Sequence, residues 1–202
     1  MSMIPEKPPF KLLDILYKKE FILFVVLVSI LIINSNISPY FLDLYNLIDS
    51  TFLFSEKAII ALTMTFVIIA RQIDLSVASI IAVSSCVLGY TTSLGYDTWL
   101  VISLTLLSGA LCGAFNGAII TKFAIPSIIV TIGTMSLFRG LAYSFLEDSY
   151  YNKFPKLVSN LGGGYLFGYI PYAFLTFIIL AVIFAFILHK TSVGKKIYSI
   201  GN

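Results

Sequence analysis

Two long apolar runs flank a short charged segment near the middle of the chain. Residues 58–70 and residues 75–94 contain only apolar, small or hydroxylated side chains, whereas Arg71, Gln72 and Asp74 lie between them. Charged side chains are costly inside a bilayer and usually face the protein interior or an aqueous path when they occur there. The segment is therefore either a cytoplasmic turn between two membrane spans or a helix break inside the membrane. Such breaks face the substrate in transporters that are built from discontinuous helices.

The composition favours a polytopic membrane protein. Hydrophobic residues make up 58% of the chain and charged residues only 11%, whereas a soluble domain has about 25% charged residues. Several runs approach the roughly 20 apolar residues that cross a bilayer as a helix. We therefore expect an all-α transmembrane bundle of about six spans, at residues 21–37, 52–70, 75–94, 99–120, 126–145 and 171–188.

The placement of basic residues predicts the orientation of this bundle. Lysines and arginines gather in the tail of residues 1–20, in the tail of residues 189–202, and in short turns at Arg71 and Lys122. The positive-inside rule then places both ends in the cytoplasm. The long polar, aromatic and glycine-rich segment of residues 147–169 is expected to be an external loop.

The pair Arg71 and Asp74 allows two local structures. On one continuous helix, residues three apart share a face and can form an ion pair. If the chain breaks there, Asp74 becomes the N-cap of a helix that begins at Leu75. In the second case Asp74 and Ser76 would offer hydrogen bonds to a polar solute on a translocation path.

Other polar and small residues in the apolar runs have two interpretations as well. Asn116, Thr131 and Thr134 either face the same path or form hydrogen bonds between helices. Gly109, Gly113 and Gly117 recur every four residues, a spacing that predicts a tightly packed helix pair.

The sequence contains no motif of a catalytic or metal site. His189 is its one histidine, and neither a GxSxG nor a GxxxxGK[ST] string occurs. We therefore expect no enzyme activity, no metal and no cofactor, and ATP would have to be bound by another chain. An ion-coupled secondary transporter remains an alternative, with Asp74 as its candidate titratable residue. A membrane enzyme such as a lipid-linked transferase is disfavoured because catalytic motifs are absent.

Three blocks of the sequence resemble one family of transport proteins. They are LTMTFVIIARQIDLSVASI, GALCGAFNGAIITKFAIPSIIVTIGTMSLFRGLAY and the tail KTSVGKKIYSIGN. In this order they resemble sugar-type ABC importer permeases, those of the ribose, rhamnose and autoinducer-2 systems. Many members have two glycines before the string IDLS, where this chain has Arg71 and Gln72. With an arginine at this position, the chain resembles the rhamnose and autoinducer-2 permeases more than the other members.

This resemblance implies partners and a location. Such permeases lie in the bacterial inner membrane, pair with a second permease copy or paralogue, and bind two cytoplasmic ABC ATPases that use the ATP. They receive solute from an extracytoplasmic solute-binding protein and are not enzymes. Members are longer, so the chain resembles their amino-terminal part. The residues that match the approach to the ATPase-coupling segment are Gly194, Lys195, Lys196, Tyr198, Gly201 and Asn202.

Overall fold

The computed structural model describes residues 19–146 and 150–201. The chain divides into two compact units, Met1–Ser50 and Thr51–Asn202. Residues 1–18 of the expected N-terminal tail, and Asn202 among the expected ATPase-proximal residues, lie outside the described part.

The first unit contains helix α2 (Lys19–Ile37) and the start of helix α3 (Leu44–Ile69). None of the α2 side chains is buried, as expected of a lipid-facing helix. The Asp43 carboxylate accepts hydrogen bonds from the backbone N–H groups of Tyr45 and Asn46, at 3.1 and 3.3 Å. This cap starts α3 at Leu44, earlier than the expected span of residues 52–70, because the charged pair Glu56 and Lys57 does not interrupt the helix.

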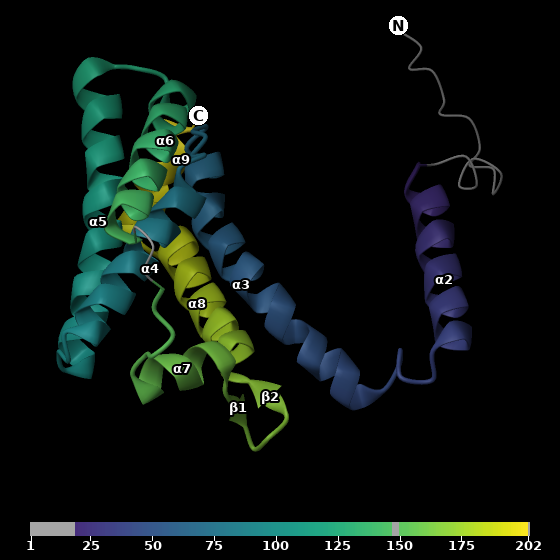
Figure 1. Cartoon of the computed structure of the whole chain (residues 1–202). Helices are drawn as coiled ribbons and strands as arrows, with labels where there is room; N and C mark the ends of the chain where they lie inside the picture. The colour runs from purple at the N-terminus through teal and green to yellow at the C-terminus, as the bar shows by residue number, and fades with distance from the viewer. Residues whose placement is uncertain (1–18, 147–149, 202) are drawn as a thin grey trace, which may run out of the picture. The chain divides into compact units, whose positions relative to one another are not determined.

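The second unit is a helical bundle with one small hairpin (Figure 1). After the end of α3, its further elements are α4 (Val77–Ser93), α5 (Thr98–Phe123), α6 (Ser127–Leu146), α7 (Lys156–Gly163), β1 (Tyr165–Leu166), β2 (Ile170–Pro171), α8 (Tyr172–Lys190) and α9 (Ser192–Ile200).

Five helices of the described residues are long and apolar enough to cross a membrane. They are α2, α3, α5, α6 and α8, and α4 is a shorter apolar helix of 17 residues. The prediction of an all-α, multi-pass bundle is therefore confirmed. The third predicted span, residues 75–94, corresponds to the short helix α4.

Helix α4 packs most extensively against α5 and α6. Its Val83 and Cys86 form a buried cluster with Phe138 and Ala142 of α6. Helix α8 packs against α7 and α9. It also meets α3 at Phe184, whose ring lies edge-on to Phe66 with 5.0 Å between the centroids. This packing fixes the start of α4 beside α5 and α6.

The predicted external loop contains regular structure. Helix α7 is followed by an antiparallel hairpin in which Tyr165 lies opposite Pro171 and Leu166 opposite Ile170. The turn of the hairpin places Phe167 and Gly168 at positive φ, 53° and 78°. The sequence analysis predicted a loop here and did not foresee the helix and the hairpin, which are held by a few contacts such as the stacking of Tyr165 on Phe52 of α3, with 6.5 Å between the ring centroids.

Candidate functional site

The charged segment between α3 and α4 is a helix break. Arg71 adopts a left-handed conformation with φ of 54°, which ends α3 because such a residue cannot continue a right-handed helix. The backbone N–H of Arg71 still donates to the carbonyl of Ile68 at 2.9 Å, and that of Gln72 donates to Val67 at 3.0 Å. The continuous-helix alternative, with Arg71 and Asp74 on one face, is therefore wrong.

Asp74 and Ser76 form a compact turn at the start of α4. Oδ1 of Asp74 accepts hydrogen bonds from the backbone N–H of Ser76 at 2.8 Å and from its hydroxyl at 2.6 Å. Ser76, which is fully buried, is the N-cap, and α4 begins at Val77 rather than at Leu75. The predicted cap was thus wrong by two residues, because Asp74 folds back on Ser76 instead of starting the helix itself.

Asn116 of α5 joins this turn from the side. Its amide Nδ2 donates to the Ser76 hydroxyl at 2.8 Å. The hydroxyl hydrogen of Ser76 goes to Asp74, so a polar chain runs from Asn116 through Ser76 to Asp74. Asn116 is only 4% exposed, and among the described residues its Oδ1 has no hydrogen-bond partner. A buried acceptor without a partner is costly and uncommon.

Helix α6 satisfies the backbone of the break. The Ser127 hydroxyl accepts a hydrogen bond from the Ile73 N–H at 3.0 Å. The Thr131 hydroxyl lies 3.3 Å from the carbonyl of Ile73 and donates at 2.8 Å to the carbonyl of Ser127. Thr134 is buried as well, but its hydroxyl lies 3.4 Å from the Thr131 carbonyl in its own helix. These bonds matter because the polar groups of a non-helical segment in an apolar bundle need partners from neighbouring helices or from water.

The break lies beside an interior part of helix α5 rather than beside its end. Asn116 precedes the last residue of α5, Phe123, by about two helical turns, or roughly 10 Å. Helix α4 has 17 residues and is therefore about 26 Å long, shorter than a hydrocarbon core of about 30 Å. The non-helical residues of the break therefore occupy the length that further turns of α4 would cover at this end of the bundle.

A cavity of about 330 Å³ lies beside the break. Its walls come from the end of α3, from the break itself, from α5, from the start of α6 and from α9. The lining residues include Gln72, Asp74, Gly113, Asn116, Gly117, Ser127, Thr131 and Ile197. Arg71 is exposed and is not part of this lining.

The three glycines of α5 have different surroundings. A Cβ added to Gly109 would lie 3.2 Å from the Ser84 hydroxyl of α4. A Cβ added to Gly113 or Gly117 would meet no atom of another described segment within 4 Å. Among the described residues, Gly109 is therefore the one glycine of the three that packs closely against another helix. The other two line the cavity beside the break.

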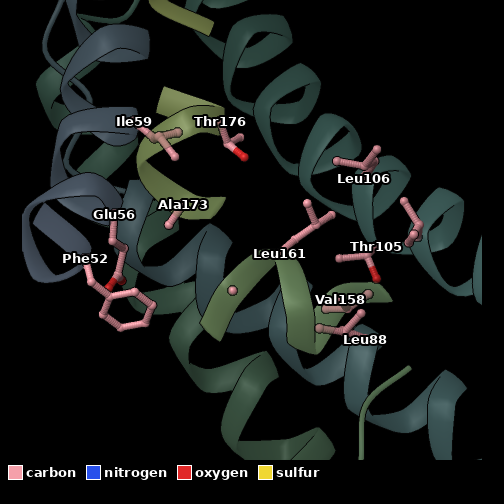
Figure 2. Close-up of a pocket in the computed structure, with 12 residues that line it drawn as sticks. Phe52, Glu56, Ile59, Leu88, Thr105, Leu106, Val158, Leu161, Ala173 and Thr176 are labelled. Atoms are coloured by element: carbon pink, nitrogen blue, oxygen red, sulfur yellow. The ribbon is translucent and has the colours of Figure 1, made fainter. Parts of the chain in front are cut away.

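A larger, mostly apolar cavity of about 570 Å³ lies near α7 (Figure 2). Phe52 and Glu56 of α3 stand on one side of it, and Thr105 and Leu106 of α5 on the other. A third cavity, of about 460 Å³, lies between α3 and α4 and is lined by both Glu56 and Asp74. Each of the two carboxylates thus borders two cavities, and about 20 Å of helix separates Glu56 from the break.

Helix α9 touches the break from the C-terminal side. The Thr191 hydroxyl caps α9 by accepting a hydrogen bond from the Gly194 N–H at 3.3 Å. A side chain added to Gly201 would collide with the Ile69 carbonyl oxygen at the end of α3. Lys195, Lys196 and Tyr198 are exposed on the same helix. Of the predicted ATPase-proximal residues in the described part, Gly194, Lys195, Lys196 and Tyr198 lie on α9, whereas Gly201 follows the helix as its C-cap and contacts Ile69 just before the break.

The structure adds residues that carried no separate signal in the sequence. Ser127 and Ile197 look like ordinary span and tail residues, and Gln72 stood out only as part of the charged segment. Glu56 lies within the expected span of residues 52–70 and carried no prediction of its own. These residues border the cavities only because segments far apart in the chain come together, and a single sequence does not reveal such contacts.

The comparison with known proteins identifies the family. Residues 46–202 match the family described as "Branched-chain amino acid transport system / permease component". The chain belongs to this permease family. The match covers the break, the helices α4, α5 and α6 that surround it, and α9.

Several relatives are import permeases. The ribose import permease protein RbsC of Haemophilus influenzae is 33% identical over 185 residues, which cover 88% of this chain and 56% of that protein. RbsC of Bacillus subtilis is 36% identical over 183 residues, with the same coverage of 88% and 56%. The autoinducer 2 import system permease protein LsrC of Escherichia coli is 34% identical over 144 residues, or 71% of this chain and 42% of that protein.

The chain spans about half the length of these relatives. No solved structure matches it. The relatives are permeases of import systems rather than enzymes, and they do not favour the ion-coupled alternative.

Proposed function

We propose that the chain is a permease subunit of an ABC-type importer for a sugar or sugar-like solute of the ribose, rhamnose or autoinducer-2 class. The observation that supports this most strongly is the similarity to ribose and autoinducer-2 import permeases over 71–88% of the chain. The polar break adds a physical argument, because a hydrogen-bonding segment within an apolar bundle is what a hydrophilic solute requires along its path.

In this proposal the subunit lies in the bacterial inner membrane with both ends in the cytoplasm. It pairs with a second permease copy or paralogue and takes solute from an extracytoplasmic solute-binding protein. Cytoplasmic ABC ATPases supply the energy from ATP, so the permease needs no cofactor of its own. Asp74, Ser76, Asn116 and Thr131 contribute to the solute path, whereas Arg71 and Thr134 lie at its margin.

The exposed basic face of α9 is the proposed approach to the ATPase. Lys195 and Lys196 lie on this helix, which packs against the C-terminal end of α8. Lys153 and Lys156 lie just before or at the start of α7, which packs against α8 as well and precedes it in the chain. These two lysine pairs belong to different ends of the bundle and provide a matched comparison.

The test is purification of the tagged chain from its native membrane, followed by mass spectrometry of the associated proteins. We expect an ABC ATPase and a second permease to be recovered. Reversal of the charges in the variant Lys195→Glu/Lys196→Glu is expected to reduce the recovered ATPase. The control Lys153→Glu/Lys156→Glu is expected to leave it unchanged. Reproducible recovery without any ATPase would contradict the proposal.

A further inference from the structure

The apolar cavity of about 570 Å³ beside α7, called the α7 cavity below, shares no lining residue with the cavity beside the break. Its walls come from α3, α4, α5 and α8, together with Val158, Leu161 and Gly162 of α7. Figure 2 shows the Leu161 side chain between Ala173 of α8 and Leu106 of α5. The solute path proposed above therefore does not account for this cavity.

The hydroxyl groups in the wall of the α7 cavity are already bonded. Thr105 and Thr176 each donate to the backbone carbonyl four residues earlier in the same helix, at 2.8 and 2.9 Å. Among the described residues that line the cavity, Glu56 is the one with a charge, and in Figure 2 its carboxylate lies beside Phe52, away from Leu161. An occupant of the cavity is therefore held by burial of apolar surface rather than by hydrogen bonds.

The chain itself leaves apolar side chains of this lining uncovered. Leu106 is 69% exposed and Leu161 is 48% exposed. Leu106 belongs to α5, which, like α3 and α8 in the same wall, is long and apolar enough to cross a membrane. In a bilayer, lipid tails rather than water surround the outer surface of such helices. The cavity is thus continuous at Leu106 with a surface that lipid tails reach.

Helix α7 has the pattern of a helix at the membrane–water interface. Val158 and Leu161 line the cavity, whereas Lys156 and Asn160 are exposed and lie on the opposite face by helical spacing. An amphipathic helix with a basic polar face lies in the interface with its apolar face toward the acyl chains. Ala173 is in the first turn of α8, so the cavity is also at the end of a spanning helix, where headgroups are near.

We infer that the α7 cavity binds one acyl chain of a phospholipid, whose phosphate lies at the level of Lys156. The cavity volume of about 570 Å³ is within the range of about 300–1,000 Å³ for small-molecule sites. The chain covers Leu106 and Leu161 and fills the space between α7 and the bundle. Helix α7 packs mainly on α8, so the lipid joins it to α5 as well. This site goes beyond the proposed function and does not depend on it.

Two adjacent glycines of α7 allow the cavity to be filled with a matched control. A Cβ added to Gly162 or Gly163 would meet no atom of another described segment within 4 Å, and only Gly162 lines the cavity. Gly162→Leu therefore fills it, and Gly163→Leu adds the same side chain outside it. Ala173→Leu fills the cavity from α8, and Ala185→Leu is its control at an exposed position of that helix outside the lining.

The experiment is native mass spectrometry of the purified, delipidated chain in detergent, titrated with palmitoyl-oleoyl phosphatidylglycerol. We expect the unchanged chain, Gly163→Leu and Ala185→Leu to retain one lipid with equal affinity. Gly162→Leu and Ala173→Leu are expected to bind it at least about tenfold more weakly, because the added side chain occupies the place of the acyl chain. Circular dichroism of each variant checks that the helices are intact.

The variant Thr105→Val/Thr176→Val distinguishes an acyl chain from a polar occupant. It removes both hydroxyl groups and keeps the shape of the wall, so it is expected to retain the lipid. Weaker lipid binding in this variant would overturn the inference. An unchanged chain that retains no lipid would overturn it as well, since a second protein would then have to cover the cavity. Equal retention in either filling variant and its control would show that lipid binds only to the outer surface, and would also overturn it.

Discussion

At the scale of single residues, Ser76 takes part in more of the hydrogen bonds at the break than its neighbours do. Its backbone N–H and hydroxyl bind Asp74, its hydroxyl accepts from Asn116, and it is the N-cap of α4. Because the residue is fully buried, water cannot replace these bonds when the hydroxyl is removed.

The variant Ser76→Ala is expected to lower the free energy of unfolding by about 1–3 kcal/mol, since it leaves buried polar atoms without this partner. The measurement is the thermal transition of the purified chain in detergent, followed by circular dichroism. Ser79→Ala is the control, because Ser79 is equally buried but its hydroxyl donates to the Ser76 carbonyl within the same helix turn. Equal losses in the two variants would contradict the role of the polar chain.

A second residue-scale prediction concerns Gly89 of α4. A Cβ at this position would come within 2.5–2.7 Å of three carbon atoms of the Tyr151 side chain. Gly89→Ala should therefore displace Tyr151 and loosen the segment before α7. We expect faster cleavage by trypsin after the exposed Lys153 in this variant.

Gly113→Ala is the matched control for that experiment. It adds the same methyl group where no described atom lies within 4 Å, and alanine is favoured over glycine in a helix by about 1 kcal/mol. Cleavage after Lys153 should be unchanged in this control. If Gly89→Ala is cleaved no faster than Gly113→Ala, the contact with Tyr151 does not hold this segment.

At the scale of elements, the contact between α9 and the end of α3 links two segments that are far apart in the sequence. Gly201 lies so close to the Ile69 carbonyl that a side chain would not fit. The contact joins the helix proposed to approach the ATPase to the residue that precedes the break.

The variant Gly201→Ala is expected to push α9 away from α3. A local destabilisation of about 1.4 kcal/mol would make amide hydrogen exchange about tenfold faster in α9. Hydrogen–deuterium exchange with mass spectrometry measures this directly. Gly162→Ala in α7, where no described atom lies within 4 Å, should leave the exchange of α9 unchanged. Unchanged exchange in Gly201→Ala as well would show that the contact does not hold α9.

Some elements follow from the sequence and others do not. Hydropathy predicts the apolar helices because each run must cover a bilayer, and α5 and α6 begin and end within a few residues of the expected spans. The start of α3 was misplaced because Glu56 and Lys57 resemble the edge of a span. Helix α7 and the hairpin were missed because short elements depend on packing against the bundle rather than on a local pattern.

At the scale of the whole molecule, the position of the break could be predicted but its surroundings could not. The residues Arg71 and Asp74 marked it, because charges rarely interrupt apolar sequence without a function. The approach of Asn116, Ser127 and Thr131 to Ile73 and Ser76 depends on how α4, α5 and α6 pack. Nothing in the local sequence distinguishes these polar residues from others that bind only within their own helix.

In the proposed importer, the cavity beside the break belongs to a hydrophilic path rather than to a sealed core. The most direct measurement is the reaction of cysteines introduced at cavity positions with a charged, water-soluble methanethiosulfonate reagent. The chain has two native cysteines, Cys86 and Cys112, which would first be replaced by serine. Gly117→Cys lines the cavity and Gly140→Cys does not.

We expect Gly117→Cys to react at least about tenfold faster than Gly140→Cys in native membranes, because the reagent attacks a thiolate that water must reach. Excess D-ribose should slow the reaction at Gly117→Cys alone. Equally slow reaction at both positions would contradict a hydrophilic path, since the break would then be a structural junction closed to water.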